Sequence, residues 1–115
     1  MVTAKMEALY EKLLPMSPAG LQISHRKDWI TFQTLASKRI RNAVTIKSEG
    51  VSFFTENSSL LNELEAEGVE SKPIADEGKK HWYRFTNLTP DLLDKYSIHF
   101  SKLFEESVRL VLHSS

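Results

Sequence analysis

The feature that most constrains the fold is a long amphipathic segment near the end of the sequence. Apolar residues recur there at steps of three and four, namely Leu92, Leu93, Tyr96, Phe100, Leu103, Phe104, Val108 and Val111. This spacing predicts a helix of roughly 22 residues with one apolar stripe. Thr89 and Pro90 mark its start, because a threonine hydroxyl can cap the first turn and proline suits the first helical position. The stripe must pack on another apolar surface, which the remaining chain has to supply.

Shorter segments with the two-residue alternation of β-strands supply that surface. They are residues 29–35, 40–47, 51–55 and 79–86. In the first of them Ile30 and Phe32 fall on one face, opposite Trp29. The connections between the first three segments are short, which favours an antiparallel meander. Residues 21–23 and 69–73 are candidates for further short strands, and the proline at the end of the second is compatible only with a sheet edge.

Two further helices complete the predicted fold. One covers residues 4–14, and a shorter one begins near Asn57, which can cap it, and ends near Gly68. Residues 74–78 are expected to form a mobile loop. The predicted order is α–β–β–β–α–β–α in a single α+β domain over residues 1–115. Its twisted, mainly antiparallel sheet has four or five strands, and the N- and C-terminal helices cover one face.

The residue inventory excludes several classes of site and compartment. The chain has no cysteine, so a disulfide framework, a thiolate nucleophile and a cysteine-ligated zinc site are ruled out. No apolar run approaches the 18 or so residues that span a bilayer. The first residues lack the apolar stretch of a signal peptide. We therefore expect a cytoplasmic protein with no membrane partner.

Catalytic, metal and cofactor sites are not indicated by the sequence. The four histidines are scattered, without the spacing that builds a zinc site, so no metal is expected. The adjacent acids Glu105 and Glu106 fall on the polar side of the final helix and are expected to face solvent. The isolated glycines form no phosphate-binding loop. These observations favour a non-catalytic domain without cofactors.

Charge is distributed unevenly along the chain, although the formal net charge is zero. Basic residues concentrate between Ser24 and Lys47, whereas acids concentrate between residues 57 and 78. Phosphate recognition needs several cations on one face, with aromatic, arginine or asparagine side chains beside them to contact bases. The residues predicted to bind nucleic acid are Arg26, Lys27, Trp29, Lys38, Arg39, Arg41, Asn42, Lys79, Lys80 and Arg84. We hypothesise an interaction domain that contacts nucleic acid through a basic β-hairpin, as an accessory module of a DNA-processing or defence system.

Two other interpretations stay open at this level. One is a protein-binding adaptor or inhibitor, which would grip a basic partner through an exposed aromatic strand and an acidic helix. Its residues are Trp82, Glu63, Glu65 and Glu67. The other is a solvated surface that binds nothing, because the domain is neutral overall whereas nucleic-acid-binding domains are usually basic.

The order of elements and the last third of the chain resemble a known bacterial group. The segments are Lys80-His81-Trp82-Tyr83-Arg84-Phe85, Leu88-Thr89-Pro90-Asp91-Leu92-Leu93 and Phe104-Glu105-Glu106-Ser107-Val108-Arg109-Leu110-Val111. They are similar to the ending of small bacterial domains of the YjbR/MmcQ type, and to an uncharacterised α+β domain attached to bacterial nucleases. The resemblance implies a compact α+β fold and, for the YjbR type, a DNA-binding role. It implies no catalytic residues.

Overall fold

The computed structural model describes residues 1–36, 39–74 and 81–113. Its helices are α1 (Ala4–Leu13), α2 (Ser58–Ala66), α3 (Pro90–Lys95) and α4 (Ser97–His113), and a short 3-10 helix, Leu14–Met16, follows α1. Its strands are β1 (Gln22–His25), β2 (Trp29–Ala36), β3 (Arg39–Lys47), β4 (Gly50–Phe54), β5 (Lys72–Pro73) and β6 (Trp82–Phe85). The predicted loop at residues 74–78 lies, after its first residue, outside the described residues.

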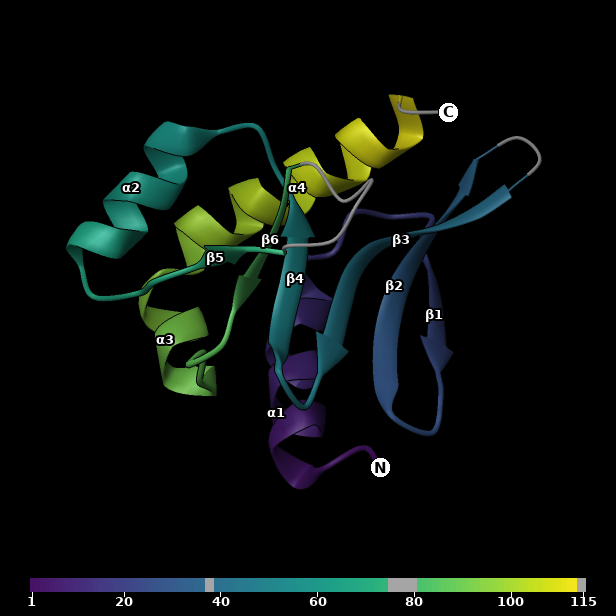
Figure 1. The fold of residues 1–115 in the computed structure, drawn as a ribbon. Coiled ribbons are helices and arrows are strands. Elements are labelled where there is room, and N and C mark those ends of the chain that lie inside the picture. The colour runs from purple at the N-terminus through teal and green to yellow at the C-terminus, as the bar shows by residue number, and fades with distance from the viewer. Residues whose placement is uncertain (37–38, 75–80, 114–115) are drawn as a thin grey trace.

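All six strands form one antiparallel sheet in the order β1-β2-β3-β4-β6-β5. The N-terminal helix α1 and the C-terminal helix α4 pack on the same side of this sheet (Figure 1). The α+β class and the one-sided helical cover are therefore confirmed. The sheet has six strands, not four or five, because both short candidate segments pair. As expected for a proline, Pro73 lies on an edge strand, where it pairs with Tyr83.

The core is the interface between α1, α4 and the inward-facing row of strand residues. Ile30 and Phe32 are buried, as the alternation predicted, and Phe32 packs edge-on against Phe104 with 4.9 Å between ring centroids. Phe100 lies 5.3 Å from Phe85 and is fully buried. The apolar stripe of the final segment is thus confirmed as the surface that faces the sheet.

The final helix is interrupted at Tyr96, where a single helix was expected. The backbone N–H of Tyr96 donates to the Leu92 carbonyl, while its own carbonyl accepts from Phe100 at 3.0 Å. Its φ of −110° and ψ of 34° lie outside the helical range, so the axis changes direction there. The break lets α3 pack on α1 while α4 packs on β2, β3 and β4, which one straight helix could not do. Periodicity cannot reveal this break, because the apolar spacing continues through it.

A β-bulge in β3 interrupts the pairing of β2 with β3. Phe32 pairs with Val44, but Gln33 pairs with Asn42, so Ala43 is an extra residue in the strand. The hydroxyl of Ser107 on α4 donates to the Ala43 carbonyl at 2.5 Å. The same hydroxyl accepts from the Phe54 backbone N–H at 2.9 Å. Ser107 therefore satisfies two backbone groups next to the bulge and fixes α4 to both β3 and β4.

We expect Phe100→Ala to lower the free energy of unfolding by about 3–5 kcal/mol, because it leaves a cavity in the centre of the core. The measurement is a urea titration followed by circular dichroism. Ile98→Ala is the matched control, since Ile98 is on the same helix but 70% exposed, and its effect should stay within about 0.5 kcal/mol. An equal, small effect for both variants would contradict this description of the core.

Ser107→Ala should cost about 1–3 kcal/mol, because it leaves the Phe54 amide and the Ala43 carbonyl buried without this partner. Ser101→Ala, on a half-exposed position of the same helix, serves as the control for helix propensity. Hydrogen exchange should show faster exchange of the Phe54 amide in the Ser107 variant only. Protection equal to that of the wild type at this amide would show that the serine bridge is dispensable.

Candidate functional site

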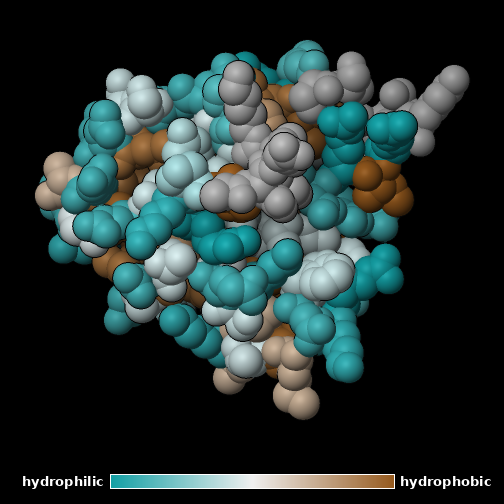
Figure 2. Space-filling view, viewed as in Figure 1, coloured by the Kyte–Doolittle hydropathy of each residue, from teal (hydrophilic) through white to brown (hydrophobic). Residues whose placement is uncertain are grey.

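The face of the sheet opposite α1 and α4 carries no described helix, and we call it the open face. Paired strand residues share a face, and residues two apart along a strand share it too. By this register the residues on the open face of β2, β3, β4 and β6 include Trp29, Thr31, Gln33, Asn42, Thr45, Lys47, Ser52, Phe54, Trp82 and Arg84. Figure 2 shows this side of the molecule, where most of the residues coloured by hydropathy are hydrophilic.

A hollow of about 190 Å³ lies on the open face. It is lined by Trp29, Asn42, Thr45, Lys47, Ser52, Ile74, Trp82 and Arg84. These residues come from β2, β3, β4 and β6 and from the residue after β5, so the hollow crosses most of the sheet. Two of the described lining residues are cationic and none is acidic. The hollow therefore favours an anionic or aromatic ligand over a cationic one.

Aromatic side chains stand at two places around this hollow. Trp29 is 38% exposed, and the ammonium of Lys47 lies 5.5 Å from its ring centroid, a cation–π arrangement. Trp82 is half-buried and packs edge-on against Phe54, with 5.2 Å between centroids. Both tryptophans of the chain thus lie on the open face, and a neighbouring side chain restricts the orientation of each.

The described residues that pair with Arg84 carry no negative charge. It pairs with Ser52 on β4 and with Lys72 on β5, so two cations stand directly opposite each other on neighbouring strands. Like charges in this position destabilise a sheet. The Nε atom of Arg84 is also buried, and it has no hydrogen-bond partner in the described structure. An arrangement that costs stability in this way is typical of a binding site.

The structure brings together only part of the predicted nucleic-acid-binding set. Trp29, Asn42 and Arg84 share the open face and line the same hollow. Arg26 and Lys27 lie in the exposed turn that leads into β2, where the backbone N–H of Arg26 bonds to the Trp29 carbonyl at 2.8 Å. The three predicted lysines Lys38, Lys79 and Lys80 lie outside the described residues.

Arg39 and Arg41 fall on the opposite face of the sheet from this hollow. Arg41 pairs with Thr34, which is buried on the helix side, and Arg39 is two residues away on the same face. The bulge at Ala43 is the cause, because one extra residue reverses the alternation of everything before it in β3. The predicted hairpin therefore does not present its arginines on the same face as Trp29.

The acidic helix of the alternative hypothesis lies apart from the open face. Figure 1 shows α2 and the β2–β3 hairpin at opposite ends of the molecule. Glu63 is 3.3 Å from the Nε2 atom of His99, and Glu67 accepts a 3.4 Å hydrogen bond from the Tyr96 hydroxyl. Glu65 is exposed. Trp82 and these three acids consequently belong to different surfaces.

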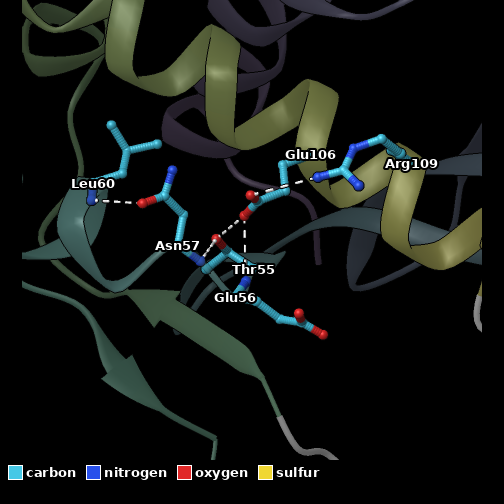
Figure 3. Close-up of polar contacts among 6 residues, drawn as sticks. All are labelled: Thr55, Glu56, Asn57, Leu60, Glu106 and Arg109. Atoms are coloured by element: carbon cyan, nitrogen blue, oxygen red, sulfur yellow. Dashed lines mark hydrogen bonds and ion pairs between the residues drawn. The ribbon is translucent and has the colours of Figure 1, made fainter.

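Sequence reasoning missed several residues of the site and one structural carboxylate. Lys47, Ser52 and Lys72 join the open face through strand register, which alternation within one strand cannot supply. Ile74, the residue after β5, lines the hollow as well. Glu106, expected to face solvent, has a side chain only 17% exposed. It accepts from the Thr55 hydroxyl and from the Glu56 backbone N–H (Figure 3).

The Glu106 contacts explain how β4 connects to α2. Thr55 accepts from the Asn57 backbone N–H at 3.0 Å, and the Asn57 side chain caps α2 by accepting from Leu60 at 3.0 Å (Figure 3). Arg109 lies 3.8 Å from the other carboxylate oxygen. This network is a structural anchor, and across the described residues no group of three histidines or acids could hold a metal ion.

Glu106→Ala should lower the free energy of unfolding by about 1–3 kcal/mol, since it removes the acceptor for the buried Thr55 hydroxyl. Glu105→Ala is the matched control, because the neighbouring side chain is exposed on the same helix. Thermal melts of both variants and the wild type give the comparison. Equal melting temperatures for the two variants would mean that the network adds nothing to stability.

Comparisons of the chain with protein-family models, with curated proteins and with solved structures found no match. The resemblance to the YjbR/MmcQ type therefore stays a prediction. No helix in residues 1–36, 39–74 and 81–113 has the length and hydropathy needed to cross a membrane.

Proposed function

We propose that this protein binds single-stranded nucleic acid on the open face of its sheet. The observation that carries the proposal is the arrangement of the hollow, where Trp29 and Trp82 stand on either side of a surface that includes Lys47 and Arg84. Proteins that bind single strands combine aromatic side chains, on which bases stack, with cations that contact the backbone. Both elements are present on the open face.

The exposure of the aromatic side chains supports stacking as the main contact. Trp29 and Trp82 are large apolar side chains that could be buried in the core, yet both keep part of their surface accessible. Lys47 over Trp29 and Phe54 against Trp82 restrict the two rings. Restricted rings lose little side-chain entropy when a base stacks on them, which favours binding.

A single strand fits this surface better than a duplex. The major groove of B-DNA admits an α-helix or a two-stranded ribbon, whereas the hollow lies across the middle strands of a broad sheet. Stacking on tryptophan also requires bases that are not already stacked inside a duplex. Sheet faces that carry aromatic side chains are a common platform for single strands.

The remaining exposed cations extend the surface toward both edges of the sheet. Arg26 and Lys27 are next to Trp29 at the β1–β2 turn, and Lys72 follows Arg84 on the outermost strand. A nucleic-acid strand that crosses the hollow would meet cations beyond both ends of the hollow. These contacts are to phosphates and give affinity without sequence preference.

The two tryptophans provide a direct test, because they are the only ones in the chain and both lie on the proposed surface. We expect an oligo-dT strand to quench their fluorescence, with an affinity that falls as salt rises through counterion release. Trp29→Ala and Trp82→Ala should each weaken binding by about 1–3 kcal/mol, the usual contribution of one stacked base. A duplex of the same length should bind more weakly.

The control is the double variant Arg39→Ala, Arg41→Ala, which removes two cations from the opposite face of the sheet. Its affinity for oligo-dT should stay within about twofold of the wild-type affinity, because removing distant charges has only a weak, screened effect. Absence of binding by the wild type at about 50 mM salt, where the electrostatic contribution is large, would refute the proposal. Loss of binding in the arginine variant only would move the site to the hairpin.

A further inference from the structure

We propose that the hollow on the open face holds one phosphate group of the bound strand, with the Arg84 guanidinium as its principal contact. This inference rests on the proposed function for the source of the phosphate. The chemistry of the hollow supports it independently, through donor groups that have no hydrogen-bond partner among the described residues.

The first support is the buried Nε of Arg84. A guanidinium N–H that is removed from water without a partner loses hydration and gains nothing in return. Arginine binds phosphate through several parallel N–H donors, and Nε is one of them. A phosphate oxygen would satisfy this atom once the Arg84 side chain turns toward the hollow, because Nε is closed to solvent in the unbound structure. It would also reduce the repulsion between Arg84 and Lys72 on the neighbouring strand.

The second support comes from counting the protons of the hydroxyls below the hollow. The Thr31 hydroxyl donates to the Val44 carbonyl at 3.1 Å, and it lies 3.0 Å from the Thr45 hydroxyl. A hydroxyl has a single proton, so Thr45 must be the donor in the second contact. Thr45 therefore has no proton left for a ligand.

The other polar groups around the hollow still have donors to offer. Asn42 uses its side-chain oxygen to accept from Gln33 at 3.0 Å, which leaves its NH₂ group for a ligand. The Ser52 hydroxyl makes no hydrogen bond to any described residue, and Lys47 supplies an ammonium. Together with Arg84, these residues supply four groups that can donate hydrogen bonds to a ligand, and no described carboxylate lines the hollow. This composition is expected of a phosphate site.

The volume of the hollow limits the size of the chemical group that it can hold. Its volume of about 190 Å³ is smaller than the roughly 300–1,000 Å³ of pockets that enclose drug-sized ligands. The hollow suits one phosphate group. The aromatic rings of Trp29 and Trp82 at its sides would contact the attached nucleosides. A phosphate within a strand should therefore bind better than inorganic phosphate.

The test compares Arg84→Met and Arg84→Lys with the wild type in two titrations, one with inorganic phosphate and one with oligo-dT. Methionine keeps the apolar length of the side chain, whereas lysine keeps the charge but lacks Nε. We expect phosphate to raise the melting temperature of the wild type and of neither variant. Binding of oligo-dT should weaken about tenfold to a hundredfold in Arg84→Met. The slope of the logarithm of affinity against the logarithm of salt concentration, which we call the salt slope, should become shallower by about 0.7. This is the value for one phosphate contact on a single strand.

Arg39→Met is the matched control, since it removes an arginine from the other face of the sheet. It should keep both the response to phosphate and the salt slope. Arg84→Lys should keep the slope but bind the strand more weakly than the wild type. If Arg84→Met does not fold, the lysine variant and the wild-type phosphate titration still decide the question.

The outcomes separate this inference from the proposed function. Strand binding with equal affinity and slope in Arg84→Met and the wild type would overturn the phosphate site and leave the proposed function in place. Wild-type protein that responds to phosphate through Arg84 but binds no strand would keep the site and overturn the function. Wild-type protein that responds to neither ligand would overturn both.

Discussion

The packing of α4 against one side of the sheet organises the other elements of the fold. Phe100 and Phe104 contact the inward-facing phenylalanines of β2, β4 and β6. α1 packs beside α4 on β2 and β3, and α2 and α3 pack on other helices. Because each described helix adds to this side, no described helix covers the opposite face of the sheet. The candidate site is a consequence of this asymmetry.

The composition of the open face differs from that of an ordinary solvated sheet. A surface selected only for solubility would pair opposite charges across strands. Here Arg84 faces Lys72, the Nε of Arg84 has no described partner, and both tryptophans are partly accessible. Each feature costs stability, and the core of a domain of 115 residues can offset such a cost. A bound phosphate and stacked bases would satisfy all three.

The bulge at Ala43 determines which residues of β3 reach that face. In a regular strand Arg39 and Arg41 would share a face with Thr45 and Lys47, and Trp29 would lie beside them. The extra residue reverses this alternation, so Asn42 joins the open face and the two arginines leave it. Ser107 fixes the bulge by bonding to the Ala43 carbonyl and the Phe54 amide. A serine inside the apolar stripe of α4 thus influences the chemistry on the other side of the sheet.

Residues close together in the chain were enough to predict the class of the fold, the main strands, the caps at Asn57 and Thr89, and the apolar stripe that forms the core. These features depend on residues close together in the chain, where periodicity and capping preferences act. The break at Tyr96, the bulge, the strand register and therefore the members of the candidate site became visible only in the folded chain. Those features arise from contacts between distant segments, such as Ser107 with Ala43 and Arg84 with Lys72. A one-residue change of register exchanges the two faces of a strand, and the alternation within one strand does not show where a bulge causes that change.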